Sequence, residues 1–180
     1  MSEFANLLEA GVAIDQPDAA AFAKPMPELG LSGGGDTCAR LAPHRDAEPF
    51  EALRARAAAR TPRPRAALLP LGDPATASAR LSFSRNLLTA GGVEAEIVTL
   101  ADYAPTDLPL VILCGTDAAY GAEAADAVRR LRAAGARKVW LAGRLGDREQ
   151  GLRDAGVDDF IFMGSDIVAM LDNALTVLER

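Results

Sequence analysis

The stretch LLPLGDPATASARLSFSRNLLTAGGVEAEIV, residues 68–98, decides the fold of this chain. An apolar, strand-like run meets Gly72, a helical run follows and ends at Gly91-Gly92, and a second strand-like run comes next. This order is typical of the opening of an α/β domain that binds a nucleotide or a cofactor. The turn between the strand and the helix, however, contains neither a glycine cluster to hold a phosphate nor a histidine to ligate a metal.

The same alternation of strands and helices continues to the end of the sequence. Because parallel strands need crossover connections, it predicts an α/β fold: a five-stranded parallel, flavodoxin-like, three-layer domain with strand order 2-1-3-4-5. The connection at 101–107 is too short and too proline-broken for a helix, so the arm or a partner is expected to cover that side of the sheet. Ser165 is expected to cap the last helix. Strands are predicted at 66–71, 93–100, 108–114, 138–142 and 159–163, and helices at 75–90, 119–134, 147–155 and 165–178.

The chain before this domain has a different character. Residues 1–45 are rich in proline and glycine and predict an extended N-terminal arm without a core of its own. Residues 46–64 predict a linker helix, which begins near Pro49 and is stopped by the prolines at 62 and 64. Residues 65–180 form the α/β domain. The arginines between Arg54 and Arg65 either meet an acidic partner or keep the helix soluble, and the residues alone leave both readings open.

Composition excludes several classes of function. The net charge of −6 argues against a nucleic-acid-binding protein, because such proteins need a basic surface. The two cysteines, Cys38 and Cys114, form no CxxC pair, which is typical of free thiols in a reducing compartment. No apolar run approaches the roughly 20 residues of a membrane span, and the first residues lack a basic signal-peptide region. We therefore expect a cytoplasmic protein that contacts neither a membrane nor nucleic acid.

Ligands of such sheets bind beyond the carboxyl ends of the strands. Asp117, Asp147 and Asp166 lie in the turns at that edge and suggest the acidic Mg²⁺ pocket of a receiver domain. That pocket needs a phosphorylatable aspartate at the end of the third strand, where this chain has Cys114. Roles as helix caps and turn residues explain the three aspartates more simply. No metal site is therefore predicted.

The other chemistry-bearing residues also form no catalytic constellation. Cys114 is expected to be an inert core thiol, because no histidine is near in the sequence to activate it. His44 lies in the arm and is not expected to be a metal ligand or a general base. The turn after the first strand is no GxGxxG, since Pro74 removes a backbone amide. Arg144, beside a helix start, could hold an anion, but a solvated arginine is the simpler reading.

Four segments carry a family resemblance: AEPFEALRARA (47–57), ARLSFSRNLLTAGGVEAE (79–96), VILCGTDAAYGAEAADAVRRLRAAGARKVWLAGR (111–144) and AGVDDFIFMGSD (155–166). With them, residues from about 46 to 180 resemble the carboxy-terminal, cobalamin-binding-type domain of the acyl-CoA mutases. The similarity is greatest to the small (beta) subunit of methylmalonyl-CoA mutase. That subunit has a barrel domain before this one, whereas only about 45 residues precede the linker helix here.

Cobalamin-binding members of the wider family carry D-x-H-x-x-G after the first strand, and the histidine coordinates cobalt. The matching positions here are Pro74, Thr76 and Ala79, so all three signature residues are missing. The family's S-x-L falls at 114–116, around Gly115, and its Gly-Gly at Ala142-Gly143. No bound cofactor is therefore expected, and the degenerate pocket positions are Gly72, Pro74, Thr76, Ala79, Gly115 and Gly143.

The resemblance implies a non-catalytic accessory subunit of an adenosylcobalamin-dependent acyl-CoA mutase, an isomerase complex whose large subunit holds adenosylcobalamin. The chain is not expected to be an enzyme by itself, and a heterodimer with the large subunit is expected. Two alternatives stay open: a free-standing cobalamin-binding or carrier module, and a degenerate receiver-like signalling domain. The residues expected to contact the partner are Phe4, Leu7, Leu8, Phe50 and Leu53.

Overall fold

The computed structural model describes residues 45–106 and 108–179. The predicted arm, residues 1–45, lies outside this part of the chain except for its last residue. The expected partner contacts Phe4, Leu7 and Leu8 therefore lie outside it too, as do Cys38 and His44.

Five parallel strands form one sheet in the order β2-β1-β3-β4-β5, which confirms the predicted flavodoxin-like α/β fold. The pairing runs from Arg65 opposite Glu94 at one edge to Ala142 opposite Ile161 at the other. The strand order reverses between β1 and β3, so the turns after these two strands lie side by side at the carboxyl edge. The strands are β1 (Arg65–Pro70), β2 (Glu94–Ile97), β3 (Leu110–Cys114), β4 (Lys138–Ala142) and β5 (Asp159–Ile161).

The helices follow the predicted order, with two corrections. The last helix is capped by Asp166 and not by Ser165: the Asp166 carboxylate accepts a hydrogen bond from the N–H of Ala169, while Ser165 Oγ accepts one from Phe162. The helix predicted at 119–134 starts earlier and contains a π-helical turn. The helical segments are α2 (Glu48–Ala58), α3 (Pro74–Ala90), α4 (Asp117–Ala119), η2 (Tyr120–Ala124), α5 (Ala125–Ala134), η3 (Gly146–Arg148), α6 (Glu149–Ala155) and α7 (Ile167–Leu178).

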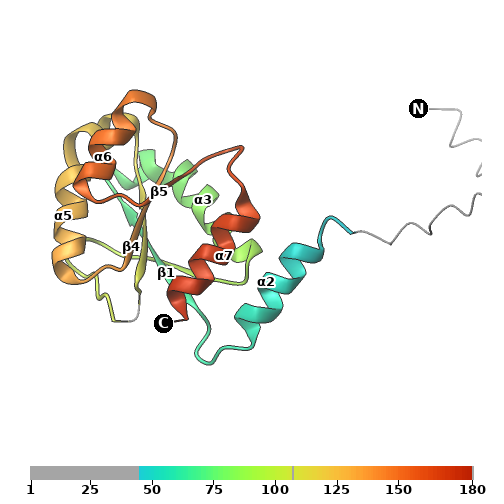
Figure 1. Cartoon of the computed structure of the whole chain (residues 1–180). Helices are drawn as coiled ribbons and strands as arrows, with labels where there is room; N and C mark the ends of the chain where they lie inside the picture. Colours follow the sequence, from blue (N-terminus) through green and yellow to red (C-terminus); the bar gives the residue numbers. More distant parts are fainter. Residues whose placement is uncertain (1–44, 107, 180) are drawn as a thin grey trace, which may run out of the picture. The chain divides into compact units, whose positions relative to one another are not determined.

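Helices cover both faces of the sheet (Figure 1). Helices α5 and α6 pack on one face, and α3 and α7 pack on the other with α2 beside α7. The described residues of the connection from β2 to β3 form no helix, as expected. Its own side chains Leu100, Tyr103 and Leu108 pack into the core there, and the Tyr103 hydroxyl donates to the carbonyl of Leu108 at 2.9 Å. None of the described helices is both long enough and apolar enough to cross a bilayer.

Helix α2, the predicted linker helix, is fastened to α7 by one arginine. The Arg56 guanidinium donates to both carboxylate oxygens of Glu179, at 2.6 and 2.7 Å, and to Asp172 at 2.6 Å. Hydrogen bonding to Arg56 holds the pKa of the Glu179 carboxyl below its ordinary value. Two-pronged contacts of this kind fix orientation as well as adding energy. The linker helix is therefore an integral part of the domain.

Changing Arg56 to glutamine is expected to lower the free energy of unfolding by about 1 kcal/mol, because the ion pairs lie near the surface, where their net contribution is small. Urea unfolding followed by circular dichroism measures this. The matched control is Arg129→Gln, since Arg129 is highly exposed and 3.5 Å from Asp126. An equal loss in both variants would contradict the fastening role of Arg56.

Candidate functional site

The carboxyl edge of the sheet is where this fold class binds ligands. The turns after β1, β3 and β4 meet there and contain Gly72, Gly115 and Gly143. Gly143 has φ +141°, a backbone conformation that other residues rarely adopt. The structure thus brings the predicted pocket positions to one edge, as the strand order requires.

A side chain of the chain itself occupies the space over these strand ends. Arg80, on α3, reaches across the edge and donates to the carbonyl of Gly115 and to the carboxylate of Asp117. A Cβ atom on Gly143 would lie 3.1 Å from the Arg80 Cζ, so the guanidinium fills the room that the missing side chain leaves. There is also no free space beside Gly115, because a Cβ atom there would lie 3.0 Å from the carbonyl oxygen of Leu71.

The guanidinium of Arg80 is held as a cation. It stacks over the ring of Tyr120, with 4.9 Å from Cζ to the ring centroid. Burial opposes the charge, but the hydrogen bond that Arg80 donates to Asp117 and the interactions with Tyr120 outweigh it, so the pKa of Arg80 is raised. Arg80 is thus a charged side chain that is held in place at the carboxyl edge and fills the space there.

The Tyr120 hydroxyl lies under the Arg80 guanidinium and contacts the backbone at three places near the ends of β3 and β4. The hydroxyl accepts a hydrogen bond from the N–H of Gly115 at 2.8 Å and lies 2.7 Å from the carbonyl oxygen of Ala142 and 3.1 Å from that of Leu113. Burial raises the pKa of Tyr120 to about 12, so the hydroxyl keeps its proton. Tyr120 is the first residue of the π-helical turn η2, and π-helical turns frequently occur at functional sites.

The residues of the first turn do not fit a cobalt site. Position 76 offers a hydroxyl in place of an imidazole, and Thr76 Oγ1 donates to the carbonyl of Asp73 at 2.8 Å. Asp73 caps α3 through the N–H of Ala75, and Pro74 occupies the first helical turn. The donors and acceptors of this turn are thus used to start a helix. Among the residues that the structure describes, no three His, Cys, Asp or Glu side chains gather as a metal ion would need.

Cys114 is fully buried at the end of β3, where the sequence led us to expect an inert core thiol. Its sulfur lies 3.4 Å from the hydroxyl of Ser84, which is also buried. Burial raises the pKa of the Cys114 thiol to about 11, far from the range of a reactive thiolate.

We expect Cys114 to resist a thiol reagent such as Ellman's reagent at about pH 8, where free thiols near their ordinary pKa react readily. The measurement uses a Cys38→Ser chain, so that Cys114 is the one remaining cysteine. One thiol per chain should be modified in guanidinium and almost none in buffer. Rapid labelling of the folded chain would contradict the burial of Cys114.

The predicted turn aspartates and the expected partner contacts on α2 have different structural roles. Asp117 and Asp166 serve as a helix-start residue and a helix cap, in agreement with the simpler reading. Phe50 is half-buried against the α3–α7 core. Leu53 is only 6% exposed in that same core, so its side chain has little surface to offer a partner. Leu53 was expected to contact a partner because the packing of α2 on α7 is not visible in the sequence.

Sequence reasoning missed Arg80 and Tyr120. Arg80 looks like an ordinary polar residue on a helix, and Tyr120 like one of many apolar residues in an alanine-rich segment. The signal that could have pointed to them is indirect: the small residues at Gly115 and Gly143 leave a space, and a large side chain has to fill it.

No protein-family model matches the chain. It is 43% identical over 148 residues to a protein from Mycobacterium bovis named probable methylmalonyl-CoA mutase small subunit, a match that covers 74% of this chain and 23% of the relative. It is 35% identical over 140 residues to the methylmalonyl-CoA mutase small subunit of Streptomyces virginiae, covering 71% of this chain and 22% of that protein. The corresponding subunit of Propionibacterium freudenreichii is 30% identical over 149 residues, covering 77% and 23%.

Two solved structures match the chain at low identity and with TM-scores below 0.5. They are a CheY-like protein from Pseudomonas aeruginosa, with 14% identity and a TM-score of 0.47 over 64% of this chain and 94% of that one, and an orphan response regulator of H. pylori, with 16% identity and a TM-score of 0.40 over 65% and 99%. The chain spans less than a quarter of the length of the curated relatives it matches. The resemblance in its sequence is thus confirmed: the chain is a homologue of part of the methylmalonyl-CoA mutase small subunits.

Proposed function

We propose that this chain is a cytoplasmic, non-catalytic accessory subunit of an adenosylcobalamin-dependent acyl-CoA mutase. The mutase that we propose is methylmalonyl-CoA mutase. The homology to small subunits supports the class of the complex. The observation that carries the non-catalytic role is Arg80, which fills the carboxyl edge of the sheet and is fixed there by Asp117 and Tyr120.

In this proposal the partner is the large, catalytic subunit, which would hold adenosylcobalamin. A partner that binds only the folded form of a subunit shifts that subunit's folding equilibrium toward the folded form. The accessory chain would stabilise the catalytic subunit in this way and contribute no reacting group. Phe50 and the stripe of Phe4, Leu7 and Leu8 are the apolar residues that we expect to lie in the interface.

The test is affinity capture of the tagged chain from its native lysate at near-physiological salt, with mass spectrometry of the eluate. A stoichiometric acyl-CoA mutase large subunit supports the proposal. A chain that elutes without such a companion contradicts it. The matched control is the same tagged chain, mildly unfolded and freed of any bound complex before the capture. A protein that elutes in this control adheres to the resin and is not a specific partner.

We expect the chain to bind no cobalamin, because Thr76 stands where the cobalt-ligating histidine would be and Arg80 fills the neighbouring space. A titration with aquocobalamin, read by absorbance and by equilibrium dialysis, should show no saturable binding. A shifted spectrum with one cobalamin per chain would favour the carrier module instead. Labelling by acetyl phosphate with Mg²⁺ would favour the receiver-like alternative.

Deleting residues 1–45 is expected to weaken capture of the large subunit by at least about tenfold. Phe4, Leu7 and Leu8 have the i, i+3, i+4 spacing that predicts a short apolar helix. A helix that short is marginal alone in water and gains most from docking on a partner. Far-UV circular dichroism should show the α/β domain still folded. The control is a chain in which only Phe4, Leu7 and Leu8 become serine, which keeps the length. Unchanged capture by both variants would contradict a role for the arm.

A further inference from the structure

A hollow lies at the amino-terminal edge of the sheet, opposite the edge that Arg80 fills, and neither the sequence nor the proposed function assigns a site there. It has a volume of about 660 Å³, within the range of small-molecule sites. Its walls come from the segment between α2 and β1, the residues before β3 and β4, and the end of α7. Its lining residues include Arg60, Pro62, Pro64, Pro109, Arg137 and Leu178.

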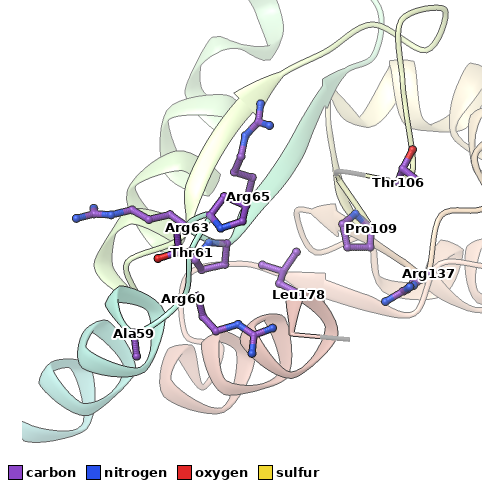
Figure 2. Close-up of a pocket in the computed structure, with 11 residues that line it drawn as sticks. Ala59, Arg60, Thr61, Arg63, Arg65, Thr106, Pro109, Arg137 and Leu178 are labelled. Atoms are coloured by element: carbon purple, nitrogen blue, oxygen red, sulfur yellow. The ribbon is translucent and has the colours of Figure 1, made fainter.

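Two arginines reach toward the same opening. Figure 2 shows Arg60 and Arg137 extending from opposite sides into the space beside Leu178, whereas Arg63 and Arg65 point away from it. Arg65 is paired with Glu96. The guanidinium of Arg137 is exposed and has no hydrogen-bond or ion-pair partner among the described residues, although the backbone of Arg137 bonds to Pro109 and Arg132.

Arg60 is positioned and still has donors to offer. Its Nη2 donates to the carbonyl of Glu179 at 2.8 Å, which fixes the guanidinium at the end of α7. Within the described part of the chain, Nε and Nη1 of Arg60 donate to nothing. Each arginine presents planar donors that match a phosphate or carboxylate group.

The rest of the wall is rigid and partly apolar. The rings of Pro62, Pro64 and Pro109 restrict their backbone φ angles, and Leu178 adds an aliphatic surface. A preformed wall lowers the ordering cost of binding. Positive charge gathers here although the whole chain carries a net charge of −6.

We propose that this hollow binds a small organic polyanion of about nucleotide size, with its phosphate or carboxylate groups between Arg60 and Arg137 and its less polar part against the proline wall. This site goes beyond the proposed accessory role and does not depend on it. The hollow lies away from Arg80. A failed partner capture would therefore contradict the accessory role alone, and a failed anion titration would contradict the anion site alone.

The experiment is calorimetric titration of the full chain at low ionic strength with pyrophosphate, ADP and citrate. We expect saturable binding that weakens with added salt. Phosphate-bearing ligands are indicated if pyrophosphate and ADP bind more tightly than citrate, and carboxylates if the order is reversed. ADP tighter than pyrophosphate would support a ligand that extends along the proline wall.

The site variant is R60Q/R137Q, and the matched control is R129Q/R130Q, which removes the same charge from the exposed face of α5. The site variant should bind at least about tenfold more weakly, while the control stays unchanged, because charge-assisted bonds are lost only in the first. R137Q alone removes no described contact and guards against misfolding of the double variant.

Equal weakening in both double variants would overturn the proposal. It would mean that the affinity depends on the net charge of the chain and not on a specific site at the hollow. No binding of any probe to the unaltered chain would overturn it as well. The arginines would then serve the carbonyl ends of the nearby helices, where positive side chains are also favourable.

Discussion

Replacing Trp140 with alanine is expected to lower the free energy of unfolding by about 3–5 kcal/mol, the usual cost of deleting a large buried aromatic side chain. Trp140 is in the middle of β4, pairs with Ile112 of β3 and Asp159 of β5, and is fully buried. It is among the largest side chains of the core between the sheet and helices α3 and α7. Because domains of this size are stable by about 5–15 kcal/mol, this one change removes a large share of the total.

Far-UV circular dichroism during urea unfolding measures the loss, since Trp140 is the only tryptophan and its fluorescence disappears with it. The control is Trp140→Phe. The indole Nε1–H of Trp140 is buried without a hydrogen-bond partner, and such a donor is costly to desolvate. Phenylalanine removes that donor and keeps most of the ring, so we expect a clearly smaller loss. A loss for Trp140→Phe as large as that for Trp140→Ala would contradict an unpartnered indole N–H, because removing such a donor should not itself destabilise the fold.

Replacing Tyr120 with phenylalanine is expected to lower the free energy of unfolding by about 1–3 kcal/mol, because a buried polar group that loses its partner costs that much. The hydroxyl is the acceptor that the structure gives to the N–H of Gly115, and it lies within hydrogen-bond distance of two buried carbonyls. Phenylalanine keeps the ring beneath Arg80 and removes only the hydroxyl. The loss therefore reports on the three strand ends alone.

Tyr103→Phe is the matched control for this substitution. Tyr103 is half-buried and donates to a single carbonyl, that of Leu108. Its loss should be near the ordinary net contribution of one hydrogen bond, about 0.5–1.5 kcal/mol. Urea unfolding of both variants in parallel decides the matter: a smaller effect at position 120 than at 103 would contradict the bridging role of Tyr120.

The fold followed from local patterns because each one is a property of neighbouring residues. The apolar run at 110–114 predicts a strand covered on both faces, and all five residues of β3 are buried. Helix α5 ends at Gly135, where φ is +105°, as a glycine after a helical run predicts. The strand at 138–142 has the predicted bounds. Boundaries were less certain where two caps compete, as at Ser165 and Asp166.

The parallel sheet, the order of its elements and the absence of a cobalt-ligating histidine from the first turn could be predicted from the sequence, because they depend on residue type and spacing. What fills the carboxyl edge and what lines the amino-terminal edge depend on the packing of segments that are distant along the chain. Arg80 and Gly143 are 63 positions apart, as the difference between their numbers shows, and meet only because α3 lies over the strand ends. Arg60 and Arg137 share one hollow for the same reason: the register of parallel strands collects at each edge residues that are distant along the chain.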